Sequence, residues 1–317
     1  MRRGLVRWGV IAGSATVLYY AIMSFAVTSF LIGNKPRWRG MNAGPGDYRL
    51  AAETVSLPAT DGVPLRAWWI PARQPARGSV VIAHGVDHTR QAMLPRAAFL
   101  VHAGYNVLTV DLRGHGESGG TVVSPGILEA NDIIGAERFA RSRDAGAPVA
   151  VLGVSYGAVA TLFAAAHTTD LAGVIVDGAF PSGGTVYRRT VSHYIHDSAT
   201  PLWLRGACGA AAVPGLVRAI SLAYRVRTGV NLGSDFGSAI SIAPRVRVPV
   251  LMISGGADWM VPLADAQELR AALANTQTTL VVIPRAGHDT TYRTAPDIYE
   301  SAVLTFLNQL AQTGGAH

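Results

Sequence analysis

The sequence predicts an α/β fold in which a mostly parallel sheet is covered by helices on both faces. Two observations support this prediction. Short, β-branched apolar runs alternate with longer stretches of helix-forming residues along most of the 317-residue chain. The apolar runs are also almost continuously hydrophobic, which is typical of strands that are buried on both faces. We therefore expect strands and helices to alternate through right-handed crossovers.

The N-terminal segment, residues 1–34, is expected to be a membrane anchor. Residues 8–32 form an uncharged run that, as a helix, would be about 37 Å long and could cross a hydrocarbon core. The run is longer than the core of an ordinary signal peptide, and no clear small-residue cleavage site follows it. We therefore favour an uncleaved anchor, with a cleaved signal as the alternative. Residues 35–50 are rich in Gly, Pro and Arg, as expected of a membrane-proximal linker.

The charge of the chain is concentrated near this apolar run. Residues 1–49 hold seven basic residues and one acidic residue, so they account for most of the formal net charge of +7. Basic flanks around an apolar span suit anionic lipid headgroups, and the nearly neutral remainder has no basic stripe that would follow a phosphate backbone. Membrane lipid is therefore an expected partner, and nucleic acid is not.

The folded body is expected over residues 51–312, with a flexible tail at 313–317. A hairpin is predicted over 53–70, around the turn sequence TDG. The strands expected after it lie at 80–83, 107–111, 149–154, 174–176, 250–254 and 280–283. The expected helices lie at 92–103, 126–141, 156–166, 263–273 and 297–311. The long interval 181–247 interrupts this alternation, and its helix-like stretches predict a cap inserted over the sheet.

A candidate nucleophile lies where one strand is expected to give way to a helix. The sequence VAVLGVSYGAVATLF places Ser155 between Gly153 and Gly157. A G-x-S-x-G match by itself arises by accident in a chain with this much glycine and serine. The strand–turn–helix context makes Ser155 a candidate, because a turn this tight has no room for side chains beside the serine.

A serine nucleophile needs a nearby base, usually an imidazole, and a carboxylate that fixes the tautomer of that base. Asp258 follows the run VPVLMIS, and His288 follows TLVVIP, so both are expected just beyond the ends of strands. Asp177 also lies at a strand end, in VIVDGAF, and is the alternative acid.

Five motifs, taken together and in this order, resemble those of the α/β-hydrolases. They are HG at 84–85, DLRGHGES at 111–118, GVSYG at 153–157, VPVLMISGGADWMVP at 248–262 and PRAGH at 284–288. The resemblance covers about residues 53–312, excludes the cap, and is nearest to membrane-anchored, prolyl-oligopeptidase-like serine hydrolases. It implies an α/β-hydrolase fold with an eight-stranded sheet flanked by helices, and the chain order serine, acid, histidine.

The resemblance also implies a role for each site residue. Ser155 would be the nucleophile, His288 the general base and then acid, and Asp258 the carboxylate that orients it. The oxyanion would be held by the backbone N–H groups of Tyr156 and Val86. No cofactor and no metal is implied.

Other polar residues have more ordinary interpretations. His193, His196 and Asp197 have a spacing that a metal could use, but without further ligands a solvated cap surface is favoured. Cys208, the only cysteine, is expected to be a small buried residue. For five polar residues of the first two motifs, a role in packing or in shaping a loop is favoured over catalysis. They are His84 of HG, and Asp111, Arg113, His115 and Glu117 of DLRGHGES.

These features predict a membrane-anchored serine hydrolase that cleaves an ester, thioester or amide through an acyl-enzyme. The apolar cap and the anchor favour an acyl-chain substrate or another small molecule over a polar peptide. An acyltransferase with the same triad and a non-catalytic anchored scaffold are the alternatives, although no triad member or motif glycine is missing. The expected location is a bacterial inner membrane, crossed once, with the catalytic domain outside the cytoplasm.

Overall fold

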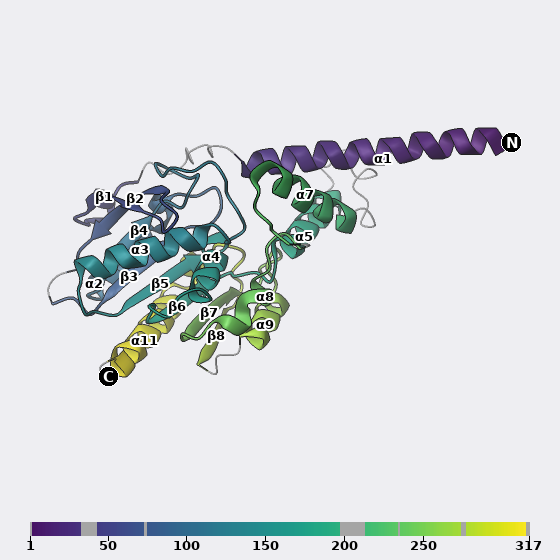
Figure 1. Ribbon diagram of the computed structural model, residues 1–317. Helices are drawn as coiled ribbons and strands as arrows, with labels where there is room; N and C mark the ends of the chain where they lie inside the picture. Colours follow the sequence, from purple (N-terminus) through teal and green to yellow (C-terminus); the bar gives the residue numbers. More distant parts are fainter. Residues whose placement is uncertain are drawn as a thin grey trace.

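The computed structural model describes residues 2–32, 43–72, 75–196, 213–233, 235–273 and 277–314. The sheet lies between two layers of helices, and helix α1 (Arg2–Leu31) extends away from this body (Figure 1). Several predictions fall outside the described residues: those for linker residues 35–42, for Asp197, for Cys208 and for tail residues 315–317.

The described strands form one sheet in the order β1-β2-β4-β3-β5-β6-β7-β8. Their bounds are β1 (Glu53–Pro58), β2 (Pro64–Ile70), β3 (Ser79–Ala83), β4 (Asn106–Val110), β5 (Val149–Val154), β6 (Gly173–Asp177), β7 (Val250–Gly255) and β8 (Thr278–Ile283). Strand β2 pairs antiparallel with both β1 and β4. All the other neighbouring strands pair in parallel. The predicted eight-stranded, mostly parallel sheet is confirmed.

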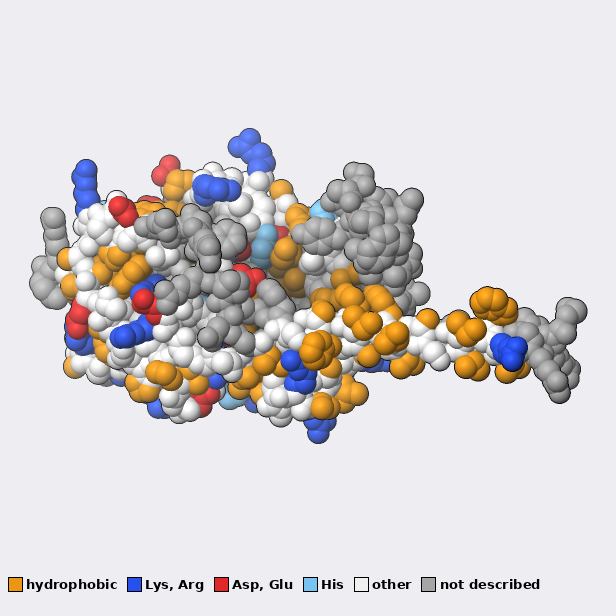
Figure 2. Space-filling view, turned by 90° about the horizontal axis from the view of Figure 1, so that it is seen from above, with side chains coloured by type: hydrophobic (Ala, Val, Ile, Leu, Met, Phe, Trp, Pro, Cys, Tyr) orange, Lys and Arg blue, Asp and Glu red, His pale blue; other side chains and the backbone are white. Residues whose placement is uncertain are grey.

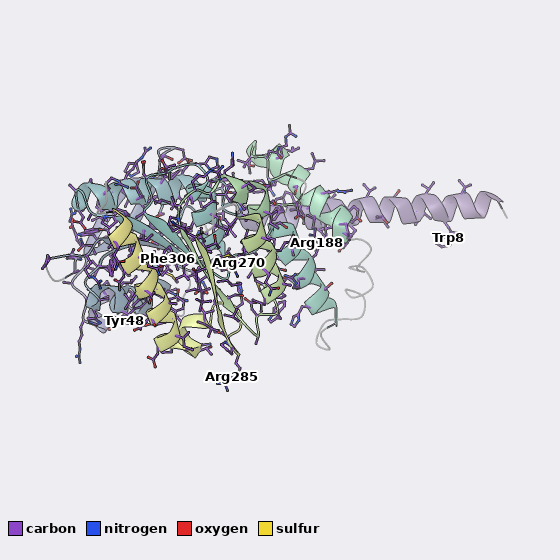
Figure 3. The ribbon with its side chains drawn as sticks, turned by 90° about the horizontal axis from the view of Figure 1, so that it is seen from below. Trp8, Tyr48, Arg188, Arg270, Arg285 and Phe306 are labelled. Atoms are coloured by element: carbon purple, nitrogen blue, oxygen red, sulfur yellow. The ribbon has the colours of Figure 1, made fainter. Side chains whose placement is uncertain are left out.

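Each face of the sheet has its own apolar core under its own helices. One face is covered by α3 (Glu129–Arg143), α4 (Tyr156–Ala165) and α9 (Leu263–Ala272). The other is covered by α2 (Leu94–His102) and α11 (Pro296–Gly314), on which Phe306 is labelled in Figure 3. Short helical turns complete the body: η1 (Pro45–Tyr48), η2 (Arg90–Met93), η3 (Ala243–Arg245) and α10 (Thr291–Thr294). Because both faces are covered, every residue of β3, β4 and β5 is buried.

The helix predicted from residue 126 begins three residues later, at Glu129. Gly126 adopts a positive φ of 91°, which places it in a turn before the helix. The carboxylate of Glu129 accepts hydrogen bonds from the Ser124 N–H at 2.9 Å and the Ser124 hydroxyl at 2.7 Å. This local network holds the chain in a loop where composition alone favours a helix.

The interval between β6 and β7 contains the helices α5 (Gly183–His196), α7 (Val213–Thr228) and α8 (Ala239–Ile242). Figure 1 shows α7 beside the body-proximal half of α1, away from the sheet. A separate apolar cluster joins the two helices, with Leu216, Val217, Ile220 and Tyr224 of α7 against Tyr19, Tyr20, Met23 and Val27 of α1. The cap therefore packs on the N-terminal helix, which the sequence did not predict.

Among the described helices, one is long and apolar enough to cross a membrane. Its apolar stretch, Val6–Ser29, has 24 residues and a mean hydropathy of 1.8. Trp8, labelled in Figure 3, lies on the part of α1 that extends beyond the body. Helices with this length and composition occur at the N-terminus both as membrane anchors and as signal sequences.

Candidate active site

Ser155 occupies a sharp turn between the end of β5 and the first residue of α4. Its backbone has a positive φ of 51°, which is uncommon for a residue with a side chain and costs conformational energy. Its N–H donates to the carbonyl of Asp177 at 2.7 Å, so the neighbouring strand supports the turn. The predicted strand–turn–helix unit is present, with Ser155 between β5 and α4.

The two glycines beside Ser155 are required by close backbone contacts. A Cβ on Gly153 would lie 2.3 Å from the carbonyl oxygen of Gly157. A Cβ on Gly157 would lie 2.6 Å from the carbonyl oxygens of both Ala83 and His84. Since these neighbours are backbone atoms, they cannot rotate away. The steric reason inferred from sequence for these glycines is therefore seen directly in the packing.

The structure brings the three predicted side chains into one hydrogen-bonded chain. The Oγ of Ser155 lies 2.8 Å from Nε2 of His288, and Nδ1 of His288 lies 2.7 Å from Oδ2 of Asp258. The other carboxylate oxygen of Asp258 accepts from the N–H groups of Met260 and Val261 at 2.9 and 2.8 Å. These two bonds fix the carboxylate plane and leave Oδ2 to face the imidazole.

Asp177, the alternative acid, is engaged elsewhere. Its carboxylate accepts from Arg96 at 2.9 Å and from the Thr291 hydroxyl at 2.7 and 2.9 Å. Burial raises its pKa, and the charge of Arg96 opposes that rise. Because Nδ1 of His288 is directed at Asp258 instead, the geometry favours Asp258 as the partner of the imidazole.

A second carboxylate, which the sequence analysis missed, lies next to the imidazole. Oδ1 of Asp289 is 3.7 Å from Nε2 of His288. Burial lowers the pKa of His288, but the hydrogen bond to Asp258 and the charge of Asp289 outweigh this, so the net pKa is raised. The sequence AGHD already places the two residues side by side, but adjacency in sequence does not reveal that both side chains face the site.

One predicted oxyanion-hole residue, Tyr156, directly follows Ser155, and the other, Val86, directly follows Gly85, which lies against Ser155. Tyr156 is the first residue of α4, and N–H groups at that position have no acceptor within the helix. Val86 belongs to a loop in which Gly85 approaches Ser155 so closely that a Cβ on Gly85 would lie 3.6 Å from the serine Cβ. The Val86 side chain is 38% exposed, so it does not belong to the core.

The remaining motif residues build the loops around the site, as expected. The Nε2 of buried His84 accepts the Leu112 N–H at 3.0 Å, and burial lowers its pKa well below the usual value, so this imidazole is neutral. The Asp111 carboxylate accepts from the Arg90 backbone N–H at 2.7 Å and from its guanidinium at 2.6 Å. These contacts hold the Gly85 loop against the motif DLRGHGES.

A buried acidic group lies behind the turn that carries Ser155. Burial raises the pKa of Glu129 to about 7, and the nearby charge of Asp132 adds to the effect. The Tyr156 hydroxyl donates to the Ser124 carbonyl, and Ser124 also binds Glu129. The first residue of α4 is thereby tied to the start of α3.

The cap is fastened to the loop that carries Asp258. Arg189 of α5 donates to the Met260 carbonyl at 2.6 Å and to the Asp265 carboxylate at 2.8 and 3.0 Å. The His193 ring stacks on Trp259, with centroids 4.0 Å apart. Stacking accounts for the placement of His193, and the described residues contain no cluster of three or more His, Cys, Asp or Glu that could hold a metal.

Comparison with known proteins finds matches over most of the chain. Residues 80–302, more than half of the chain, match the sequence model of a family described as the Alpha/beta hydrolase family. YfhR of Salmonella typhi, described as uncharacterized, is 27% identical over 263 residues that cover 81% of each chain. The Alpha/beta hydrolase domain-containing protein WAV2 of Arabidopsis thaliana is 25% identical and covers 84% of this chain and 82% of its own.

Solved structures show the same fold. An esterase of Pyrococcus furiosus, Pf2001, superposes with a TM-score of 0.70 at 24% identity, covering 88% of this chain and 98% of the esterase. At this identity the match is informative about the fold and does not extend to the substrate. The matches identify a superfamily and no particular branch within it.

Proposed function

The chain belongs to the alpha/beta hydrolase family, and on this premise we propose that it is a serine hydrolase that uses Ser155, His288 and Asp258 as a catalytic triad. The observation that carries the proposal is the unbroken chain of hydrogen bonds from the Ser155 hydroxyl through His288 to Asp258, at 2.8 and 2.7 Å. A hydroxyl, a base and an orienting carboxylate in this arrangement are the requirements of acyl transfer through a covalent intermediate.

The proposed reaction has two halves. In the first, Ser155 attacks the substrate carbonyl while Nε2 of His288 takes the hydroxyl proton and then passes it to the leaving group. In the second, water attacks the acyl-enzyme, gives its proton to His288, and Ser155 leaves with that proton. The negative oxygen formed in each half would be held by the N–H groups of Tyr156 and Val86, and one such donor contributes about 3 kcal/mol.

We propose an ester as the first substrate class to test, ahead of a thioester or an amide. The esterase character of the Pyrococcus furiosus neighbour supports this order. The narrower assignment to a prolyl-oligopeptidase-like branch is likewise part of the proposal, and its support is the set of sequence motifs.

We further propose that α1 is an uncleaved, single-pass membrane anchor, with the hydrolase body outside the cytoplasm. The packing of α1 on the cap supports an anchor over a cleaved signal. Removal of α1 would expose Leu216, Val217 and Ile220, which are each at most 2% exposed in the intact chain. An apolar face of this kind destabilises a soluble protein when it is uncovered.

Labelling with a fluorophosphonate probe tests the triad. The parent protein is expected to react, and Ser155→Ala is expected to lose both the label and the hydrolysis of p-nitrophenyl esters. Ser142→Ala, which removes an exposed hydroxyl in α3, is the matched control and should behave as the parent. Labelling that persists in folded Ser155→Ala would show that another residue is the nucleophile.

A further inference from the structure

We infer that the cap helix α7 inserts into the membrane leaflet nearest the body, as a second lipid contact beside α1. The inference rests on the proposed anchoring by α1 and goes beyond it, because an anchor alone would leave the cap in water. It assigns a lipid surface as the partner of the exposed face of α7.

The length of α1 is the first argument. A hydrocarbon core about 30 Å thick needs about 20 helical residues, and the apolar stretch Val6–Ser29 has 24. Tyr19 is the first α1 residue that packs against the apolar cluster of α7, and residues 6–18 before it are only about 20 Å long at about 1.5 Å per residue. These residues are about 10 Å shorter than the hydrocarbon core. The core must therefore also surround part of residues 19–29, against which α7 packs.

Side-chain contacts hold α7 against residues 19–29. Gly215 is so close to Tyr20 that a Cβ on it would lie 2.8 Å from the tyrosine hydroxyl oxygen. Further along α7, Arg227 donates to the Phe25 carbonyl at 3.2 Å, and its guanidinium lies 4.7 Å from the centre of the Phe25 ring. A bilayer that surrounds this part of α1 therefore also contacts α7.

The surface of α7 suits that environment. Leu222 and Val226 are 63% and 77% exposed, and because they are four residues apart they lie on one face of the helix. The helix sequence VPGLVRAISLAYRVRT has three arginines and no acidic residue. Arg218 and Arg225 are exposed on the same side of α7 as Leu222, so their long side chains would reach outward to anionic headgroups while Leu222 and Val226 contact acyl chains.

The molecular surface is consistent with one continuous apolar region. Figure 2 shows hydrophobic side chains along α1 that continue onto the part of the body where α1 joins it. Exposed apolar side chains on α1 include Val17, Leu18, Ile22 and Phe25, each at least 57% exposed. Isolated apolar side chains are common on soluble proteins, whereas a continuous patch of this kind marks a contact surface.

Insertion of α7 would place the candidate active site beside the bilayer. The cap holds the Asp258 loop through Arg189 of α5, which binds the Met260 carbonyl and Asp265. Because Tyr187 and Val191 of α5 pack against the apolar cluster of α7, the membrane contact and the loop of the proposed catalytic acid belong to one packed unit. The substrate class that fits this position is an acyl ester whose chain remains in the leaflet while its carbonyl reaches Ser155.

The test measures membrane depth at single positions of the full-length protein. In a Cys208→Ala background, Leu222→Cys is labelled with an environment-sensitive NBD fluorophore and placed in nanodiscs of phosphatidylcholine and phosphatidylglycerol, with or without doxyl-labelled lipid. Nanodiscs expose both membrane faces to water, so the orientation of the protein does not matter. We expect a blue-shifted emission that doxyl lipid quenches, and Val226→Cys should repeat the result.

Two further positions make the outcomes distinct. Val10→Cys, at a position 64% exposed in α1, reports on the anchor, and its emission should be quenched by doxyl lipid. Ile298→Cys, at a position 49% exposed in α11, reports on the water-facing body, and its emission should not be quenched. Quenching at Val10 but not at Leu222 or Val226 would overturn the inserted cap and leave the anchor intact. Absence of quenching at Val10 as well would overturn the anchor itself. Parental ester hydrolysis by each labelled protein shows that it is folded.

Discussion

Replacement of Asp258 by asparagine is the sharpest test of how the candidate site works. In the native protein, Oδ1 of Asp258 accepts N–H bonds from Met260 and Val261, and Oδ2 faces Nδ1 of His288 at 2.7 Å. An asparagine must keep its oxygen toward the two N–H donors, because its NH2 group there would leave two buried donors without acceptors. The NH2 group therefore faces the imidazole.

This orientation inverts the tautomer of the base. Nδ1 of His288 would have to accept from the new NH2 group, so the ring proton would move to Nε2. Nε2 could then no longer accept the hydroxyl proton of Ser155. In enzymes with this type of triad, such a substitution lowers kcat by about 10⁴-fold, which corresponds to about 5 kcal/mol of transition-state stabilisation. The serine itself stays in place, so folding should be little affected.

The assay compares kcat/KM for a p-nitrophenyl ester in the parent, Asp258→Asn and Asp297→Asn. Asp297→Asn removes an exposed carboxylate in the first turn of α11 and serves as the matched charge control. Thermal melting verifies that each variant is folded. Activity of Asp258→Asn within tenfold of the parent would refute the argument that this carboxylate sets the tautomer.

Three further predictions concern the surroundings of the proposed triad. Gly157→Ala is expected to lower the free energy of unfolding by about 1–3 kcal/mol and to abolish activity, because the new Cβ would lie 2.6 Å from backbone oxygens. Thermal melting measures the loss of stability. The control is Gly46→Ala, which should not change stability, because a Cβ there has nothing within 4 Å. Burial raises the pKa of Glu129 from 4.5 to about 7, so folding favours its protonated form and stability falls as the pH rises through this range. Glu129→Gln should remove that part of the pH dependence of Tm, and an unchanged dependence would show that another group is responsible. Asp289→Asn should lower the pKa of His288 and move the acid limb of the kcat/KM profile to lower pH, and an unmoved limb would contradict the contribution of this charge.

Much of the fold follows from local properties of the chain. Fully apolar runs of four to six residues predict buried strands, and the alternation with helices predicts a covered parallel sheet. The prediction of the turn at Ser155 succeeds for a similarly local reason, since the steric need for small residues acts within five positions. The start of α3 was less predictable, because the hydrogen bonds between Ser124 and Glu129 compete with the helix and leave no signature in the composition of the segment.

The sequence by itself determined the buried strands, the glycine-flanked turn of Ser155 and the presence of a long apolar N-terminal segment, because each depends on residues that are neighbours in the chain. Only the tertiary structure shows that Asp258 faces the imidazole of His288, whereas Asp177 is engaged by Arg96, which is 81 residues away in the chain. The tertiary structure alone also placed α7 on α1. Such pairings depend on which surfaces meet after folding, and no local pattern records them.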